Sequence, residues 1–526
     1  MRKLLAKISA FVLTLASVSP LTGLKANAAE EKTIDMYLVA GQSNAAGYTK
    51  TESIPADKMK NVYQVGFDKV FYYGNADSHS VYNFSTQVRL GLGWTASHFG
   101  PEIGMAEMIT KYSGKQSIIV KCAYGGSGLV DNTSSQSHSY GNWTSPSMIN
   151  PATAHATKTG YNYNQFIQRI SEAVEHYESE GYTINLKGTF WMQGEAEMGM
   201  ASQTYATALT ALINDLREDY ATFFEQTNAT TAPFVIGKIA PTYMGRPDLN
   251  ETVRVAQDQV AANMDNVYCV ETKDYIIVDP STGQPAEGCP DQYHFSGKDV
   301  LSLGQEVGKA MVLVDAKDRL EVDVLSGGDV KIVGTELGYV KLDGIPIEVT
   351  FTPEKYHYLS KVFLDGEEVT DQVVDGKYIF NGTTGVHYLT AEFEKYGQYD
   401  LTIETNETKG KLSRDPVLAK YYPDTQIKIT PKPAKGYKLK SLTFNGVEVE
   451  KTGTFYKITT VQGENKLVAE WEKIEDGEKV ETPTDPPDVP ATEENNSSCF
   501  SGMGILPAIL TIGITAFATK KRNQIK

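Results

Sequence analysis

Cysteine is scarce in this chain, with only four among 526 residues, at positions 122, 269, 289 and 499. Small domains held together by disulfides carry a much higher density of cysteine, so the chain is not a disulfide scaffold. No two cysteines have the close spacing of a zinc site, and we predict no metal. Cys269 and Cys289 could form a disulfide in an exported protein, and a pair of free thiols is the alternative.

Basic residues are outnumbered by acidic ones. The chain has 49 Lys and Arg against 65 Asp and Glu, and its formal net charge is −16. A protein that binds nucleic acid needs a basic surface to neutralise phosphates, and none is visible here. We therefore expect no nucleic acid as a partner. A neutral or cationic ligand fits this charge better.

Long hydrophobic runs are confined to the two ends of the chain. Residues 1–28 combine a basic start, an apolar stretch and the small-residue pattern Ala26-Asn27-Ala28. This pattern is typical of a signal peptide, so we predict secretion and a mature chain that begins near Ala29.

At the other end, residues 474–498 are rich in Pro, Thr, Asp and Glu, which predicts an extended linker. Residues 499–526 contain an uncharged apolar run followed by Lys520-Lys521-Arg522, which predicts a hydrophobic anchor with a basic tail. This arrangement resembles that of surface proteins of Gram-positive bacteria, although the sorting motif Leu-Pro-x-Thr-Gly is absent from the sequence. We expect the tail to hold the protein at the membrane or cell wall.

Residues 29–317 alternate between strand-like and helix-like segments. This alternation predicts an α/β domain with three layers, α/β/α, around a five-stranded, mostly parallel sheet. The five strand candidates are Thr33–Ala40, Ser117–Cys122, Leu186–Met192, Pro233–Ile239 and Val267–Val270. Helices are predicted from Gly100 and over 166–178, 205–220, 253–264 and 300–314.

Two insertions, residues 50–99 and 131–163, interrupt this alternation. Loops of this length are usually functional or disordered. Their tyrosines and Trp143 are candidates for stacking on sugar rings, and a plain aromatic surface loop is the alternative.

The helical pattern ends near residue 318, and two similar segments follow, 318–397 and 398–473. Phe363 to Val369 corresponds to Thr443 to Val449, with Asp-Gly and Asn-Gly as hairpin turns. These are internal repeats of a small all-β module. They resemble modules of bacterial surface proteins, and we interpret them as spacers, with carbohydrate binding as the alternative.

Polar residues follow four of the predicted strands, where open α/β sheets place their ligands. Ser43 follows the first strand, Gly125-Gly126 the second, Gln193 the third and, after a loop, Asp291 and His294 the fifth. A serine needs a base to become a nucleophile, and His294 can serve, with Asp291 orienting its ring. Oxyanion donors are then the backbone N–H of Ser43, that of Gly125 or Gly126, and the Gln193 side chain.

Five motifs together resemble the SGNH hydrolase superfamily, and more closely its branch of sialate O-acetylesterases and carbohydrate acetylesterases. They are Gly41-Gln-Ser-Asn44, Gly100-Pro-Glu102, Cys122-Ala-x-Gly-Gly-Ser127, Trp191-x-Gln-Gly-Glu195 and Asp291-x-x-His294. The resemblance implies an SGNH-hydrolase fold and a cofactor-free serine esterase. It assigns catalysis to Ser43, Asp291 and His294, and the oxyanion hole to Ser43, Gly126 and Gln193. Supporting or substrate-contact roles fall to Gln42, Asn44, Gly125 and Glu195.

One motif departs from the family pattern. After Gln-Gly-Glu the family often has Ser and then Asp or Asn, whereas Ala196-Glu197 stands here. Glu195 is interpreted as an orienting partner for the Ser43 turn.

The resulting hypothesis is a secreted, surface-anchored serine esterase that removes O-acetyl groups from carbohydrates, with sialic acids of glycans as the first substrate class. An acetylxylan or plant polysaccharide esterase is the nearest alternative. A lipase or thioesterase would need an apolar acyl channel, which the polar insertions disfavour. A catalytically inactive, glycan-binding adhesin is the alternative from another class of protein.

Overall fold

The computed structural model describes residues 32–54, 59–131, 141–152, 154 and 158–475. The chain divides into two compact units, one up to Tyr396 and one from Gly397. The predicted signal peptide and anchor lie outside the described residues, as does the predicted linker from residue 476 onwards. Within the described ranges, no helix is long and apolar enough to cross a membrane.

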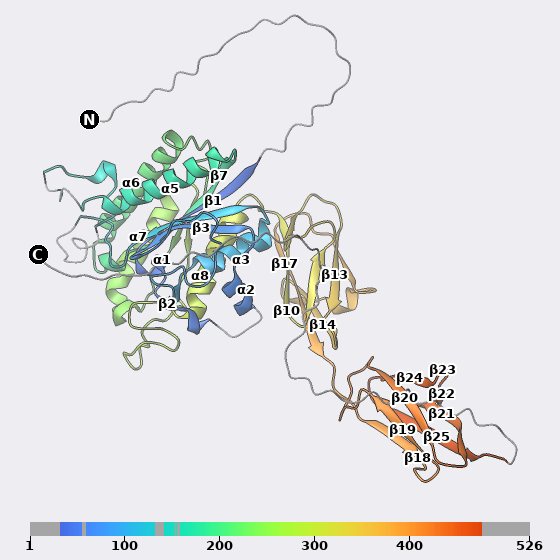
Figure 1. The fold of residues 1–526 in the computed structure, drawn as a ribbon. Helices are drawn as coiled ribbons and strands as arrows, with labels where there is room; N and C mark the ends of the chain where they lie inside the picture. Colours follow the sequence, from blue (N-terminus) through green and yellow to red (C-terminus); the bar gives the residue numbers. More distant parts are fainter. Residues whose placement is uncertain (1–31, 55–58, 132–140, 153, 155–157, 476–526) are drawn as a thin grey trace, which may run out of the picture. The chain divides into compact units, whose positions relative to one another are not determined.

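The first unit is built on a seven-stranded sheet with the order β4-β3-β6-β1-β7-β8-β9. Figure 1 labels β1, β3 and β7 of this sheet. All neighbouring strands are parallel except β4, which pairs antiparallel with β3. The strands are β1 (Thr33–Gly41), β3 (Val70–Ala76), β4 (His79–Val81), β6 (Ser117–Ala123), β7 (Thr183–Met192), β8 (Phe234–Gly237) and β9 (Val267–Val270). All five predicted strands form, but the predicted five-stranded layout is wrong because β3 and β4 extend the sheet.

The sequence does not predict strand β3, because β3 lies inside the insertion 50–99 and contains Gly74, a residue that is typical of turns. Gly74 has φ +136°, and a Cβ there would lie 1.9 Å from the carbonyl oxygen of Lys121 in β6. The glycine therefore lets the two strands approach closely enough to pair.

Helices cover both faces of this sheet (Figure 1). Side chains of α5, α6 and α7 share one core with Met36, Leu38 and Ala40 of β1, whereas those of α3 and α8 share the other with Tyr37 and Val39. The alternation along β1 gives the predicted three layers. The helices are α1 (Ser43–Ala46), α2 (Met59–Val65), α3 (Glu102–Tyr112), α5 (Tyr161–Ser179), α6 (Ser202–Thr222), α7 (Pro247–Asn263) and α8 (Gly297–Val312).

Helices α3 and α8 pack unusually closely. A Cβ at Gly104 would lie 2.2 Å from the carbonyl oxygen of Leu301, and one at Gly304 would lie 2.1 Å from that of Pro101. Only glycine at these two positions allows the helix backbones to meet. The loop that contains His294 leads directly into α8, which begins at Gly297. The packing of α8 on α3 therefore helps to fix this loop against the sheet.

The rest of the first unit is all β, in two sheets ordered β12-β10-β17-β14-β15 and β11-β13-β16. The strands are β10 (Arg319–Ser326), β11 (Gly328–Ile332), β12 (Tyr339–Lys341), β13 (Ile347–Pro353), β14 (His357–Leu364), β15 (Glu367–Glu368), β16 (Lys377–Phe380) and β17 (Val386–Lys395). This module contacts the α/β domain through Glu321, which accepts a hydrogen bond from Tyr112 at 3.0 Å and pairs with Lys309 at 3.3 Å.

The second unit has a similar strand plan, with two four-stranded sheets, β18-β25-β21-β22 and β19-β20-β24-β23. In both modules the last long strand pairs parallel with the first strand and antiparallel with a hairpin strand. The hairpin turns Asp365-Gly366 and Asn445-Gly446 have positive φ at both residues, as the repeat predicts. The strands are β18 (Leu401–Thr405), β19 (Gly410–Asp415), β20 (Gln426–Pro433), β21 (Tyr437–Phe444), β22 (Val447–Glu448), β23 (Lys451–Thr452), β24 (Phe455–Thr459) and β25 (Asn465–Lys473).

Candidate active site

The predicted nucleophile lies at the carboxyl end of the central strand. β1 ends at Gly41, whose φ is +143° and whose Cβ position would fall 2.0 Å from the carbonyl oxygen of Met192. Only glycine fits where β1 turns so closely against β7. Ser43 then opens the short helix α1 and is 8% exposed. Since β6 and β7 flank β1, the loops after all three strands meet here, at the topological switch point of the sheet.

Asn44 ties this turn to the loop that carries His294. Its Nδ2 donates to the carbonyl oxygen of Tyr293 at 3.2 Å, and its Oδ1 accepts from the N–H of Phe295 at 3.3 Å. The neighbour of Ser43 thus holds the backbone on both sides of His294. Residues about 250 positions apart in the chain are brought to one edge of the sheet.

Asp291 and His294 form the predicted pair. The ring Nδ1 of His294 lies 2.8 Å from Oδ2 of Asp291, and Oδ1 of Asp291 accepts the backbone N–H groups of Tyr293 at 2.7 Å and of His294 at 3.0 Å. Burial raises the pKa of the Asp291 carboxyl, but the histidine and these backbone donors outweigh it and hold the pKa below its usual value. The carboxylate is therefore ionised and oriented to support a charged imidazole.

Gln42 and Gln193 join the β1 turn to the loop after β7. Oε1 of Gln42 accepts from the Gln193 side chain at 3.2 Å and from the N–H groups of Gly194 and Ala196, both at 3.3 Å. Gln42 is thus a supporting residue that fixes one loop against another.

Gln193 makes several contacts within the protein besides its predicted role. Its side chain is fully buried, and its amide nitrogen also lies within hydrogen-bonding reach of the Ser127 carbonyl oxygen at 3.2 Å and of the Glu197 carboxylate. Two amide hydrogens thus already face three protein oxygens. The predicted oxyanion donor is committed to the protein because three loops converge on it, which spacing in the sequence does not reveal.

Two buried carboxyl groups flank this network. Glu195 accepts from Asn44 at 2.7 Å, so it supports the Ser43 turn as interpreted from the sequence. Burial raises the pKa of Glu195. Burial also raises the pKa of Glu197 to about 7, although its partners Gln193, Leu129 and Val130 lower it. Glu197, which departs from the family pattern, is buried and joins the loop after β7 to the loop after β6.

The glycine turn after β6 is anchored to the turn that carries Ser43. The N–H of Tyr124 donates to the carbonyl oxygen of Gly41 at 3.1 Å, and Ser127 closes the turn onto Tyr124 at 3.3 Å. Gly126 is half-buried with φ +66°, whereas Gly125 is buried. Of the two glycines, Gly126 is the more accessible to a ligand.

Three further residues lie against the site. The ring of Tyr48 stacks on that of His294 at 4.6 Å between centroids and on that of Trp94 at 4.6 Å, and its hydroxyl donates to Asp77. No motif contains these residues: Asp77 and Trp94 lie in the insertion 50–99, and Tyr48 lies just before it.

Trp143 does not face a ligand. Its indole is fully buried, packs edge-on against Trp191 at 5.1 Å and donates to Oγ of Ser127 at 3.0 Å. The expectation that it stacks on sugars is wrong, because it belongs to the core beneath the glycine turn.

Cys269 and Cys289 are free thiols and do not form the disulfide that the sequence allowed. Each donates to a backbone oxygen at 3.4 Å, Cys269 to Gln257 and Cys289 to Ile276. Among the described residues, no cluster of three His, Cys, Asp or Glu side chains is arranged to hold a metal ion.

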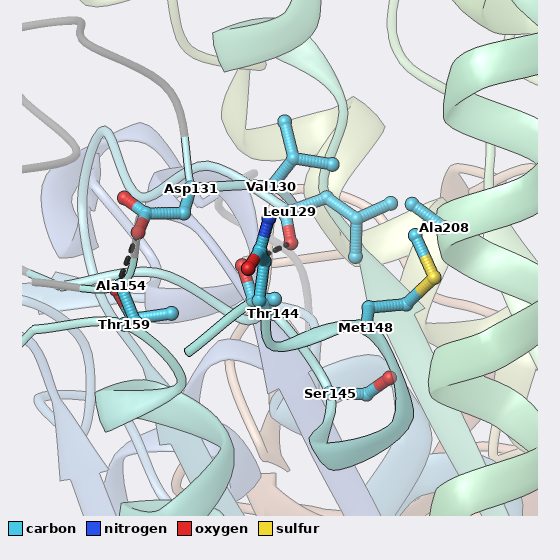
Figure 2. A pocket seen from close by; sticks show the side chains of 10 residues that line it. Leu129, Val130, Asp131, Thr144, Ser145, Met148, Ala154, Thr159 and Ala208 are labelled. Carbon is cyan, nitrogen blue, oxygen red and sulfur yellow. Dashed lines mark hydrogen bonds between the residues drawn. The ribbon is translucent and has the colours of Figure 1, made fainter. Parts of the chain in front are cut away.

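A cavity of about 150 Å³ lies beside the loop after β6 (Figure 2). Its lining includes Leu129 and Val130, whose backbone N–H groups bond Glu197, and Asp131, whose carboxylate accepts from Thr159. Ser43, Asp291 and His294 are not among the lining residues that the structure describes. The cavity is therefore adjacent to the buried network rather than to the nucleophile.

Several solved structures are similar to this chain. A protein from Arabidopsis thaliana is 17% identical, with a TM-score of 0.35, and the match covers 53% of this chain and 98% of that one. A carbohydrate acetylesterase from Xanthomonas citri is 15% identical, with a TM-score of 0.34 and coverage of 67% and 74%. NanS is 16% identical, with a TM-score of 0.37 and coverage of 54% and 99%. No curated protein matches the chain.

A family match covers the whole α/β domain. The sequence model of the family described as "Carbohydrate esterase, sialic acid-specific acetylesterase" matches residues 33–313, which is more than half of the chain. This span runs from β1 to the end of α8 and includes every residue predicted for the site. The chain therefore belongs to the carbohydrate esterase family of sialic acid-specific acetylesterases.

Proposed function

We propose that this chain removes O-acetyl groups from carbohydrates with Ser43 as nucleophile, His294 as general base and Asp291 as the residue that orients the base. The observation that carries this proposal is the pair of hydrogen bonds between Asn44 and the backbone on both sides of His294, one donated to Tyr293 and one accepted from Phe295. Together with the Asp291–His294 contact at 2.8 Å, these bonds hold nucleophile and base at one edge of the sheet.

In the first step, the hydroxyl proton of Ser43 passes to Nε2 of His294 while Oγ bonds to the acetyl carbonyl carbon. The carbonyl π electrons move to oxygen, giving a tetrahedral oxyanion. The intermediate collapses, the bond to the sugar oxygen breaks, and His294 returns the proton to that oxygen. Water, deprotonated by His294, then attacks the acetyl-serine, and acetate leaves as Ser43 regains its proton.

The oxyanion needs donors that are in place before the reaction. We assign this role to the backbone N–H groups of Ser43 and Gly126, which belong to two loops joined by the Tyr124–Gly41 hydrogen bond. To donate to the oxyanion as well, the Gln193 amide would have to give up a hydrogen bond to the Gln42, Ser127 or Glu197 oxygen. We therefore assign it first to holding these loops in register.

For the substrate, we propose O-acetylated sialic acids of glycans, as the family description suggests. Acetylated xylan is the second candidate, as the nearest alternative that the sequence leaves open. We also propose that the protein is secreted and held at the surface of a Gram-positive bacterium, on the strength of the terminal segments 1–28 and 499–526. N-terminal sequencing of the mature protein and protease treatment of intact cells would test this location.

The test of function is hydrolysis of an aryl acetate by the full chain and by Ser43→Ala. We expect the variant to lose activity by at least about 1,000-fold, with Ser85→Ala, at an exposed serine, as the control. Equal activity in Ser43→Ala would exclude this nucleophile. An inactive parent that still binds glycans would instead support an adhesin. Acetate released from acetylated sialic acid, xylan and pectin would rank the substrates.

A further inference from the structure

Tyr48 lies between two aromatic rings. Its ring is 4.6 Å from that of His294 with an interplanar angle of 14°, and 4.6 Å from that of Trp94 with an angle of 2°. If the imidazole and the indole both lay on the same face of the Tyr48 ring at this spacing, they would collide with each other. They therefore cover opposite faces of Tyr48. The result is a column, Trp94–Tyr48–His294, that ends on the proposed base.

The hydroxyl of Tyr48 is also fixed. It donates to the carboxylate of Asp77, whose own N–H donates to the carbonyl oxygen of Ala123 at 2.6 Å. A Cβ at Gly125 would lie 2.5 Å from the Tyr48 hydroxyl and 2.9 Å from Oδ2 of Asp77. The Tyr48–Asp77 pair therefore fills the space between the histidine and the glycine turn after β6.

We propose that Tyr48 and Asp77 are positioning residues that hold the imidazole of His294 from its face and stabilise its protonated form. This inference rests on the proposed function, in which His294 carries a proton during each half of the reaction. A phenol that donates to a carboxylate has a more electron-rich ring, and the face of such a ring attracts a cation. Asp291 supports the same imidazole at its edge, through Nδ1.

Other groups also face this imidazole. Tyr293 approaches it edge-on at 6.1 Å, and Glu195 and His98 interact with it electrostatically. These residues come from other elements than Tyr48 and stay unchanged in the variants below. A difference between the parent and a Tyr48 variant therefore reports on the stacked face.

The test compares three variants in the full chain with an aryl acetate as substrate. Tyr48→Leu removes the ring, and Tyr48→Phe keeps the ring but loses the bond to Asp77. Asp77→Asn replaces the carboxylate by a neutral amide of the same size. Tyr268→Leu, at an exposed tyrosine on the edge strand β9, is the control.

We expect Tyr48→Leu to lower kcat by about tenfold with KM nearly unchanged, and Tyr48→Phe and Asp77→Asn to lower it by about threefold. The acidic limb of the pH profile should move to lower pH, most in Tyr48→Leu, because the protonated imidazole loses its support. Parental kcat and a parental acidic limb in all three variants would overturn the proposal. So would a change in KM alone. If Tyr48→Leu does not fold, the same criteria apply to the two conservative variants.

A second readout does not depend on catalysis. In Ser43→Ala protein labelled with ¹³C at the histidine rings, the NMR titration midpoint of His294 should fall when Tyr48 is replaced by Leu, and stay unchanged in Tyr268→Leu. An unchanged midpoint in the Tyr48 variant would refute the inference while leaving the esterase proposal intact. Full activity of Ser43→Ala would exclude Ser43 as the nucleophile, and the titration would still decide the role of Tyr48.

Discussion

Nδ2 of Asn44 donates to the buried carboxylate of Glu195 at 2.7 Å, although 151 positions separate the two residues in the chain. The same nitrogen donates to Tyr293, and Oδ1 of Asn44 accepts from Phe295. One side chain therefore joins the nucleophile turn, the loop after β7 and the loop of the proposed base. Its orientation depends on Glu195, because the carboxylate accepts only from the amide nitrogen and so fixes which end of the Asn44 amide faces Phe295.

Replacing Asn44 by Ala should therefore lower kcat by about 10- to 100-fold, since small displacements of a nucleophile relative to its base are costly. Asn44→Asp should be as damaging, because its second oxygen would face Glu195. Steady-state kinetics would measure both variants, with Asn83→Ala, at an exposed position outside this network, as the control. Parental kcat in Asn44→Ala would show that the loops are held without it.

Glu197 should make stability depend on pH. Its folded pKa of about 7 lies above that of the unfolded chain, so the native state binds more protons between these two values. Its contribution is fully present below about pH 4.5 and is lost as pH rises through 7, by on the order of 3 kcal/mol.

The comparison with Glu197→Gln, which cannot ionise, isolates this contribution. Urea unfolding from pH 4.5 to 8 should show the parent losing stability relative to the variant as pH rises. A constant difference across this range would mean that Glu197 titrates normally.

Trp143→Ala should act on folding rather than on substrate binding. The indole fills the core against Trp191 and bonds Ser127, so its removal should lower the free energy of unfolding by about 3 to 5 kcal/mol. Urea unfolding would measure this loss. A stable variant with a raised KM for glycans, and a parental KM for an aryl acetate, would restore the sugar-stacking interpretation.

Glu321 should matter for the stability of the α/β domain. It is buried and contacts Tyr112, Lys309 and Arg319, so Glu321→Ala leaves these groups without their common acceptor. We expect a loss of about 3 kcal/mol in the free energy of unfolding. Asp323→Ala, which removes a 62%-exposed partner of Lys111, is the matched control and should change it by less than about 0.5 kcal/mol.

A fragment ending at Asp318 lacks Glu321 altogether, and it should melt at lower temperature than one ending at Tyr396. Equal melting temperatures of the two fragments would support the interpretation of the first module as a simple spacer.

The features that the sequence predicts correctly depend on residues that are close together in the chain. The five predicted strands are mostly apolar segments, and Asp291 and His294 are close enough in the chain for one turn to join them. The turn at Gly41 is also predictable, because an apolar strand ends there and a short polar motif follows.

The parts that the sequence did not reveal depend on contacts between distant segments. Gln193 was predicted as an oxyanion donor, but oxygens from two other loops and from Glu197 in its own loop surround its amide. Trp143 is predicted as a candidate for stacking on sugar rings, with a surface loop as the alternative, yet the indole itself is in the core. Tyr48 stands outside every motif, and only the fold places its ring on His294.

The central claim is that Ser43 is the residue that attacks the ester, activated by His294. The most direct measurement is labelling of the full chain with a fluorophosphonate, followed by peptide mass mapping. We predict one adduct per chain, on the peptide that contains Ser43, and its loss in His294→Ala. An adduct on another residue, or active enzyme with no adduct at Ser43, would contradict the account.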